Sequence, residues 1–468
     1  MESVNDTSKT AVKSGIWYTI SNFLLKSISL ITIPIFTRIL TKNEFGQFNN
    51  YISWLHIMTI FVTLNLSFSM ITAKYDYKEN LDKYTLSCFS LSGVSAMIWF
   101  VILNIFSTFF TNISNLSIYY INCMIVYLFF HSVILLFQMR TKFLFKYKTN
   151  IIINIVHSVG AAILAVCLVL IMKNKLQGRI IGAVIPTVII GICLIIYILR
   201  KERKICIEHW KYALKVSIPY IPHSLSLILL SSLDKIMINN ICGSDKTALY
   251  SLACSCTVAI TLLSKSLNDA YAPWLGEKLK EKNIDNIRNF SKKYILIFFM
   301  IVYGMILIMP EILLALGGKE YMEAKFILLP IALGAIYQFL YTLFVNIEQL
   351  QKKTLSMSIA TVVTAIINCI SNFIFINKFG YIAAAYTTVA SYMILLAIHM
   401  GIVYKMGYSR VYDYKFVLLI ALLGAIMIGI TNALYLMTSI RIVISISYIT
   451  VMLILIYKNK EKIIKDLK

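Results

Sequence analysis

The sequence predicts an all-α polytopic membrane protein with about 14 transmembrane helices. Three observations predict this fold class: 59% of the 468 residues are hydrophobic, only 14% are charged, and the mean hydropathy is +0.78. Soluble domains have roughly a quarter of their residues charged. The apolar residues recur in runs of about 20, which is the length of a membrane helix and roughly twice that of a membrane β-strand.

Each apolar run is long enough to cross the membrane once, and short polar connections separate the runs. Because no connection is long enough for an extramembrane domain, we expect the function to reside in the helices and their loops. We place the spans at residues 15–37, 45–70, 85–110, 116–137, 150–172, 179–199, 213–238, 248–272, 293–316, 326–347, 354–376, 381–404, 415–437 and 439–457.

The distribution of positive charge predicts the orientation. With the N-terminus inside, 31 of the 44 Lys and Arg residues lie in or beside the cytoplasmic tails and loops, and 10 lie in the outer loops. Short cytoplasmic loops of membrane proteins carry this excess of positive charge, so we expect both termini in the cytoplasm. We therefore attribute the net charge of +23 to the positive residues of the cytoplasmic loops and tails, and we do not expect nucleic acid as a partner.

Two halves of the chain share a weak pattern. In each, a membrane helix ends in a short polar turn, and a small-x-aromatic triplet opens the next helix, at Gly46-Gln-Phe48 and at Ala248-Leu-Tyr250. Parallel repeats of six spans place a substrate between them. We predict a six-helix lobe at 1–204, a second at 205–404, and two additional helices with a basic cytoplasmic tail at 405–468.

The first span carries Lys26 at its middle, with Asn22 and Ser29 on the same helical face. A lysine at bilayer depth costs roughly 2.5–3.5 kcal/mol on the insertion scale. We interpret this face as the lining of a wet cavity in which Lys26 meets an anion. The alternatives are a lysine that reaches the membrane interface and one that pairs with an acidic residue on a neighbouring helix.

Polar residues recur at helical spacing on other spans, as a shared cavity requires. Polar groups within a span must face protein or water, because lipid cannot satisfy them. The alternative is that they form hydrogen bonds between packed helices. The further cavity-lining candidates are Asn49, Ser53, His56, Ser224, Asp234, Lys235, Asp269, Gln338, Asn346 and Asn368.

The sign of the deep charges predicts the substrate class. Lys26 and Lys265 are the deep cations, and Asp269, one turn after Lys265, is in position to neutralise it. One or two free lysines suit an anion such as phosphate or pyrophosphate, whereas a cation exporter needs unpaired carboxylates. His56 is the candidate for proton coupling, with a neutral hydrogen-bonded histidine as the alternative.

Prolines near equivalent ends of the two halves are candidate hinges, because proline removes a helical hydrogen bond and permits bending. Packing kinks are the alternative. These prolines are Pro34 in the first span, Pro219 and Pro222 at the start of the seventh, and Pro273, which we expect to end the eighth.

Motifs for enzymatic or metal chemistry are absent from the sequence. It contains no Gly-x4-Gly-Lys-Ser/Thr and no His-Glu-x-x-His, and its nine cysteines do not have zinc-site spacing. We expect no metal, no cofactor and no enzymatic activity. Energy for transport must then come from an ion gradient, the membrane potential, or substrate supply and removal.

The chain resembles the bacterial polysaccharide flippases of the Wzx type, within the MATE-like superfamily of multidrug and oligosaccharidyl-lipid exporters. The resemblance covers nearly the whole chain and rests on the fourteen spans and on three motifs. These are Arg38-Ile-Leu-Thr-Lys-Asn-Glu-Phe-Gly-Gln-Phe48, Asp234-Lys235 and Asn268-Asp-Ala-Tyr-Ala-Pro-Trp274.

The resemblance implies a cavity between two six-helix lobes and a flippase that moves undecaprenyl-pyrophosphate-linked oligosaccharide by alternating access, for O-antigen, capsule or exopolysaccharide synthesis. Related lipid II flippases carry cationic residues on the first and eighth helices, and Lys26 and Lys265 are similarly placed. Lysine cannot bind phosphate in the bidentate manner of arginine. The implied location is the bacterial cytoplasmic membrane, and we expect a monomer, with glycan polymerase and chain-length proteins as candidate partners.

Two other functions stay open at this point. A cation-coupled multidrug exporter has the same fold. A membrane glycan polymerase or ligase is the second alternative, but such enzymes usually have a sizeable outer loop with catalytic Arg or His, and no long outer loop is predicted here.

Overall fold

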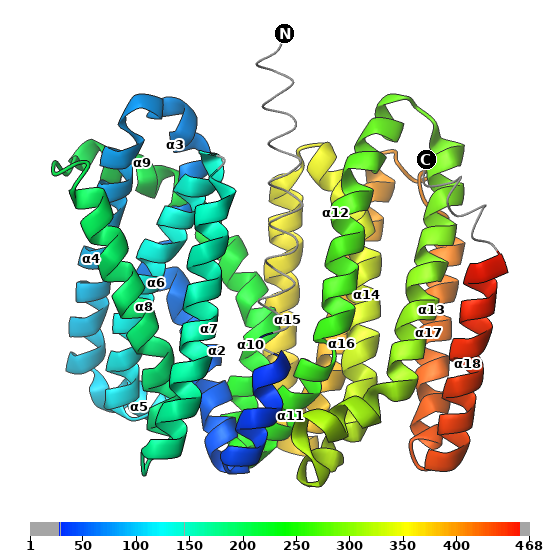
Figure 1. The fold of residues 1–468 in the computed structure, drawn as a ribbon. Helices are drawn as coiled ribbons and strands as arrows, with labels where there is room; N and C mark the ends of the chain where they lie inside the picture. Colours follow the sequence, from blue (N-terminus) through cyan, green and yellow to red (C-terminus); the bar gives the residue numbers. More distant parts are fainter. Residues whose placement is uncertain (1–27, 29, 145, 459–468) are drawn as a thin grey trace. The chain divides into compact units, whose positions relative to one another are not determined.

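The computed structural model describes residue 28, residues 30–144 and residues 146–458, which form helices and short connections without a β-strand (Figure 1). In this part of the chain eleven helices have the length and composition of a membrane span, and one bent helix pair forms a twelfth. Each corresponds to one predicted span. The first and last predicted spans are represented by the shorter apolar helices Leu30–Ile39 and Thr438–Met452. The predicted all-α polytopic fold is confirmed.

The chain divides into two compact units, Met1–Ala248 and Leu249–Lys468. The predicted lobes at 1–204 and 205–404 remain a prediction. Within the first unit the seventh span packs along the second. In the first unit the elements after Leu30–Ile39 are α2 (Lys42–Thr63), η1 (Leu66–Phe68), α3 (Met70–Asp76), η2 (Lys78–Asn80), α4 (Leu81–Ile105), α5 (Ser107–Ser114), α6 (Ile118–Phe143), α7 (Tyr147–Ile171), α8 (Lys175–Leu199), α9 (Ile207–Ser217), η3 (Ile218–Tyr220) and α10 (Ile221–Cys242).

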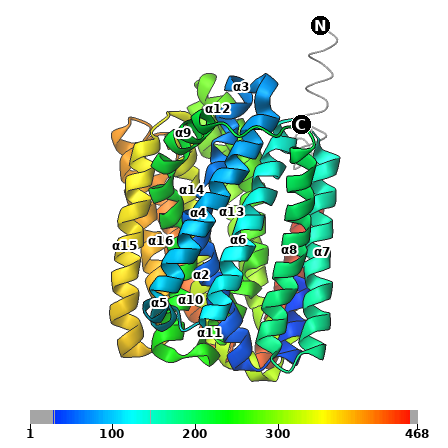
Figure 2. The same cartoon turned by 90° about the vertical axis from the view of Figure 1, so that its left-hand side faces the viewer.

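Within the first unit α4, α6, α8 and α7 lie side by side, as Figure 2 shows. Buried apolar residues from α2, α4, α6 and α8 form the core; fully buried Tyr84 also donates a hydrogen bond to Ser69 Oγ at 2.7 Å. By contrast, the only buried residues of α7 are Asn150, Ala165 and Val169. An apolar helix surface left uncovered by protein is stable only in lipid.

The helix α11 (Ser244–Cys256) contains the division between the units. The elements that follow in the second unit are α12 (Val258–Lys280), α13 (Ile284–Gly317), η4 (Lys319–Ala324), α14 (Lys325–Leu350), α15 (Thr354–Phe379), α16 (Ile382–Lys405), α17 (Tyr414–Leu434) and α18 (Thr438–Lys458). Within this unit α14 packs against α16, and α13 contacts α14, α17 and α18.

The start of α2 is specified locally by a capping box. Thr41 Oγ1 accepts a hydrogen bond from the Glu44 backbone at 3.2 Å, and the Glu44 carboxylate accepts one from the Thr41 backbone at 2.9 Å. This arrangement satisfies two backbone donors that a helix start leaves unpaired. It lies in the Arg38–Phe48 motif and fixes where the second span begins.

The second span is broken, contrary to the continuous helix predicted for 45–70. Leu64 and Asn65 adopt positive φ angles of 48° and 52°, and the chain bends by 59° between Lys42–Thr63 and Leu66–Asp76. A left-handed conformation costs roughly 1–2 kcal/mol for a residue such as leucine. Hydrogen bonds of Asn65 to Thr63 Oγ1 at 3.2 Å and to Ser224 Oγ at 3.1 Å hold the bend.

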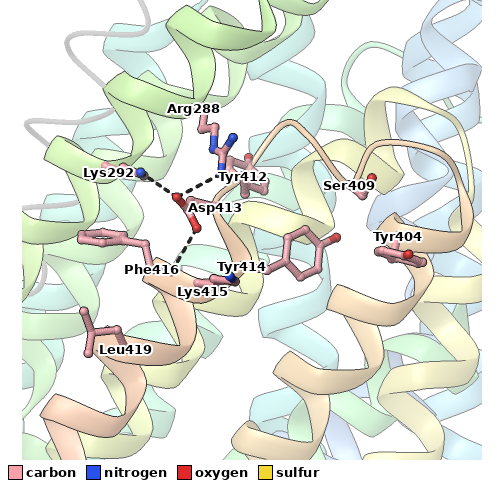
Figure 3. Close-up of a pocket in the computed structure, with 10 residues that line it drawn as sticks. All are labelled: Arg288, Lys292, Tyr404, Ser409, Tyr412, Asp413, Tyr414, Lys415, Phe416 and Leu419. Atoms are coloured by element: carbon pink, nitrogen blue, oxygen red, sulfur yellow. Dashed lines mark hydrogen bonds and ion pairs between the residues drawn. The ribbon is translucent and has the colours of Figure 1, made fainter.

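Asp413 attaches the start of α17 to α13. Its carboxylate accepts hydrogen bonds from Lys292 at 2.6 Å, from Arg288 at 3.1 Å and from the Phe416 backbone at 3.2 Å (Figure 3). The hydrogen bond from Lys292 and the nearby positive charges lower the pKa of Asp413 to about 2. Asp413 therefore combines the role of a helix cap with that of an ion-pair partner.

We predict that this contact disappears only in strong acid. An aspartate has a pKa of about 4 in an unfolded chain. Because the folded value is lower, the stabilisation is complete above about pH 4 and is lost as the pH falls towards 2. Asp413→Asn, which keeps a capping oxygen, should lower stability by about 1 kcal/mol at pH 7. Asp413→Ala should lower it further, because it also removes the cap.

Thermal melting of the purified protein between pH 3 and pH 7 tests this prediction. The difference between the original protein and Asp413→Asn should be constant down to about pH 4 and then shrink. A difference that already disappears between pH 7 and pH 5 would contradict the assignment.

Candidate functional site

The first predicted anion contact lies outside the described part of the chain. Asn22, Lys26 and Ser29 all fall there, so their roles remain predictions. Pro34, the hinge candidate of the same span, lies inside the helix Leu30–Ile39, and its carbonyl accepts a hydrogen bond from Thr37 Oγ1 at 3.3 Å.

The second and seventh spans pack along what we call the α2–α10 seam, and three close approaches mark its course. At one end, just past α10, Gly46 lies against the first residue of α11: a β-carbon on Gly46 would lie 1.8 Å from the Ser244 carbonyl oxygen. In the middle His56 Nδ1 lies 3.4 Å from Ser232 Oγ, and beyond the end of α2 Asn65 contacts Ser224. The seam therefore runs antiparallel through the depth of the first unit.

Two of the predicted cavity-lining residues, His56 and Ser224, lie in the α2–α10 seam. His56 is exposed although it lies in the middle of α2, and Ser224 is half-buried. Their partners, Ser232 and Asn65, were not among the predicted site residues. The spacing of eight residues between Ser224 and Ser232, which is close to two helical turns, is the signal that could have identified Ser232.

Asn49 and Ser53 bond within their own helix. The Asn49 amide donates to the Phe45 carbonyl at 2.8 Å, and the buried Ser53 hydroxyl donates to the Asn49 carbonyl at 2.9 Å. Asp234 on α10 is buried, with 4% of its surface exposed, and Lys235 is half-buried. These placements leave Lys235 as the more accessible charge of the Asp234-Lys235 motif.

Lys265 is an exposed cation within an apolar span. It lies on α12, and Asp269, one turn later, is exposed as well. No ion pair joins Lys265 to Asp269 or to another residue that the structure describes. The ion pair through which Asp269 would neutralise Lys265 is therefore not formed between these two described residues. Lys265 is too far from Pro273 to contact it. Eight residues separate them, or roughly 12 Å along the helix, which is farther than a lysine side chain extends.

Two predicted lining residues join helices of the second unit. Asn346 on α14 is buried and donates a hydrogen bond to Asn268 Oδ1 on α12 at 2.7 Å. Asn368 on α15 is 1% exposed and donates to Ser391 Oγ on α16 at 3.1 Å. Both contacts fit the alternative of hydrogen bonds between packed helices. Gln338 on α14 is half-buried, and its backbone carbonyl accepts from Thr342 Oγ1 at 2.7 Å.

The hinge candidates of the second half occupy different local structures. Pro219 lies in η3 and Pro222 in the first turn of α10, so these two prolines mark a break between α9 and α10. Pro273 lies inside α12, which continues to Lys280, and the prediction that it ends the eighth span is wrong. Buried Tyr271, whose hydroxyl lies 2.7 Å from Ser291 Oγ, and buried Leu275 hold α12 in place on both sides of the proline.

A buried polar cluster in the second unit was missed. His399 Nδ1 lies 2.5 Å from the Glu348 carboxylate, and both side chains are at most 2% exposed. Ser356 donates a second hydrogen bond to Glu348 at 3.0 Å, and the Tyr341 ring stacks on His399 with 5.6 Å between ring centroids. The cluster joins α14, α15 and α16. The signal in the sequence was a single glutamate directly after a long apolar run.

Two arginines of the first unit were also missed. Arg140 is buried and bonds through Nε to Asp82 at 2.6 Å. The guanidinium carbon of Arg179 lies 3.6 Å from the centroid of the Phe36 ring and 4.6 Å from that of Phe48. Such cation–π contacts let a charged group lie among apolar residues.

In the described part of the chain no group of three or more His, Cys, Asp or Glu residues could hold a metal ion.

Comparisons with known proteins agree with this architecture. The family model described as Polysaccharide biosynthesis protein matches residues 11–279, and the model MatE matches residues 219–374. No curated protein matches the chain. Among solved structures, the lipid II flippase MurJ in an inward closed conformation has a TM-score of 0.74 and 16% identity, covering 95% of this chain and 99% of that one.

Multidrug transporters have the same fold. An inward-facing MATE family transporter of the MOP superfamily has a TM-score of 0.60 at 13% identity, covering 83% of this chain and 94% of that one. A Vibrio cholerae MATE transporter has a TM-score of 0.55 at 13% identity, covering 86% and 99%. At these identities the likeness establishes the fold that the chain shares with flippases and drug transporters.

Proposed function

Because the chain belongs to the polysaccharide biosynthesis protein family, we propose that it is a flippase for lipid-linked oligosaccharide. Its substrate is an undecaprenyl-pyrophosphate-linked oligosaccharide unit, which it moves from the cytoplasmic to the outer leaflet by alternating access. The units supply the synthesis of a surface polysaccharide such as O-antigen, capsule or exopolysaccharide.

Lys265, which is exposed and forms no ion pair with any residue in the described ranges, carries this proposal. A lysine within a span is costly in lipid, so its exposure favours a water-filled space and an anionic ligand. Pyrophosphate supplies the negative charge, and Lys265 acts as a point charge towards it. In the proposal Lys26, which lies outside the described residues, makes the second anion contact.

Other predicted residues acquire roles in the same proposal. His56, exposed in mid-span, lines the water-filled path together with Ser224, Lys235, Asp269 and Gln338. The oligosaccharide hydroxyls bond to such side chains, while the polyprenyl tail stays in lipid.

Alternating access then needs bending, for which we propose the break at Pro219 and Pro222, with Pro34 and Pro273 as further hinges. These four prolines lie in or beside helices α10, α12 and Leu30–Ile39.

The membrane potential favours the proposed direction of transport. Outward movement of an anion gains roughly 2.3 kcal/mol per charge per 100 mV if the charge crosses the whole field. This argument assumes the predicted orientation, with the protein in the cytoplasmic membrane and both termini inside. We further propose a monomer that works beside glycan polymerase and chain-length proteins, in the two-lobe arrangement predicted from the sequence.

The second candidate function is multidrug export. It is favoured by the MatE model, which matches residues 219–374, and by the MATE transporters of the same fold. The two functions differ in the charge of the cargo, because cationic drugs need a carboxylate where the proposal has lysine.

Deletion of the gene tests the proposed function. Lipid-linked oligosaccharide should accumulate on the cytoplasmic side and surface polysaccharide should disappear, because synthesis continues without translocation. Both effects should be reversed when the gene is restored on a plasmid. Normal surface polysaccharide together with increased drug sensitivity would favour the multidrug exporter instead.

A further inference from the structure

A cavity of about 630 Å³ lies in the second unit. Its lining residues come after Lys265 in the sequence, and the proposed transport assigns no role to them. It is formed where α13 begins, α16 ends and α17 begins, and we call it the α13–α17 pocket (Figure 3). These helix ends are on the side predicted to be cytoplasmic. The pocket is lined by Arg288, Lys292, Tyr404, Ser409, Tyr412, Asp413, Tyr414, Lys415, Phe416 and Leu419.

The charges of the α13–α17 pocket do not balance. Its lining contains three cations, Arg288, Lys292 and Lys415, and one carboxylate, Asp413. Arg288 and Lys292 share that carboxylate and remain 44% and 38% exposed. Lys415 is exposed and forms no ion pair with a described residue. The lining therefore keeps an excess of two positive charges that face solvent or a ligand.

The ion pairs with Asp413 also join α13 to α17, so a purely structural role must be weighed. That role occupies one Nη of Arg288 and one donor of Lys292, whereas a guanidinium has five N–H donors and an ammonium has three. It does not involve Lys415. The remaining donors point to an anion with several acceptor oxygens, such as a phosphate group.

Apolar and aromatic side chains continue the α13–α17 pocket beyond its charged layer. Leu419, 50% exposed, lies further along α17 than Lys415, and Tyr404 on α16 is 65% exposed. The Tyr414 hydroxyl donates a hydrogen bond to the Met400 carbonyl at 3.1 Å, which fixes one wall. Tyrosine is typical of the membrane interface, and exposed leucines further along a span face acyl chains.

We propose that the α13–α17 pocket binds an anionic phospholipid through its phosphodiester headgroup. The phosphate lies against Arg288, Lys292 and Lys415, and the acyl chains follow the exposed surface around Leu419. A basic pocket between membrane helices suits such headgroups. A zwitterionic lipid matches the charge less well, because its own cation approaches the same lysines. The lining of this pocket shares no residue with those assigned to the proposed transport path, and the proposal does not depend on the proposed function.

Native mass spectrometry of the full-length protein in detergent tests the proposal, with dioleoyl phosphatidylglycerol and dioleoyl phosphatidylcholine as probes. Phosphatidylglycerol should bind more tightly. Lys415→Gln should weaken it about fivefold, which corresponds to the ~1 kcal/mol that one Lys or Arg gains near anionic lipid. Ser409→Glu, which adds a carboxylate to the lining, should weaken it at least as much. Lys378→Gln removes an exposed charge from the end of α15 and should have no effect.

Three results would overturn the proposal. Phosphatidylcholine could bind as tightly as phosphatidylglycerol, which would exclude recognition of charge. Lys415→Gln and Ser409→Glu could both leave phosphatidylglycerol binding unchanged, which would place the lipid elsewhere. Inorganic phosphate at 10 mM could displace phosphatidylglycerol completely, which would make the pocket a site for soluble phosphate.

Discussion

Lys265→Gln is expected to lower the export of lipid-linked oligosaccharide about ten- to a hundredfold. The glutamine keeps a polar side chain of similar length but removes the exposed charge on α12, which forms no ion pair within the part of the chain that the structure describes. Contacts between a charged group and a hydrogen-bond partner contribute about 1.5–3 kcal/mol, which sets this range. Lys265→Arg should keep most of the activity, because it keeps the charge. Surface polysaccharide in a deletion strain that carries each variant is the measurement.

Lys280→Gln is the matched control, because Lys280 is an exposed lysine at the end of the same helix. It should export normally, and membrane levels of all variants should be equal. The corresponding substitutions of Lys26 should have the same effects, so that Lys26→Arg is active and Lys26→Gln is inactive. Full export by Lys265→Gln and Lys26→Gln would show that neither lysine contacts the substrate.

Gly46→Ala is expected to destabilise the protein by about 2–3 kcal/mol, although alanine is normally the better helix residue. The added β-carbon would lie 1.8 Å from the Ser244 carbonyl oxygen and 2.5 Å from its carbon. Both are backbone atoms, so α2 and the start of α11 must separate. The substitution thereby tests whether α2 approaches the start of α11 as closely as described. Thermal melting of purified protein should show a fall of several degrees.

Gly401→Ala provides the comparison for this prediction. Gly401 lies inside α16, and a β-carbon there would meet nothing within 4 Å. It should therefore leave stability unchanged or raise it by up to about 1 kcal/mol. A Gly46→Ala protein that melts like Gly401→Ala would mean that α2 and Ser244 do not approach closely.

The sequence predicted the spans well because each is an apolar run of membrane length. It predicted their ends less well where a helix extends into polar sequence. The ninth span was placed at 293–316, whereas α13 spans Ile284–Gly317 and begins with a cap from Asn283. The break after α2 was not predictable, because Leu64 adopts a left-handed conformation that its residue type does not favour.

The candidate site was predictable only in part. Lys265 was found because a charge in an apolar run is conspicuous. The sequence could not show whether Asn368 lines a cavity or joins two helices, because polar residues have the same helical spacing on a cavity face and in a hydrogen-bonded contact between helices. Glu348 and His399 are 51 residues apart in the sequence, so only the fold brings them together.

Translocation by the purified protein in vesicles is the most direct test of the central claim that it moves a lipid-linked pyrophosphate oligosaccharide. A fluorescent polyprenyl-pyrophosphate oligosaccharide would be placed in both leaflets, and a membrane-impermeant quencher would report how much of it changes leaflet. The account predicts rapid exchange in vesicles with the original protein and slow exchange with Lys265→Gln. Equal exchange in protein-free vesicles, or undiminished exchange with Lys265→Gln, would contradict it.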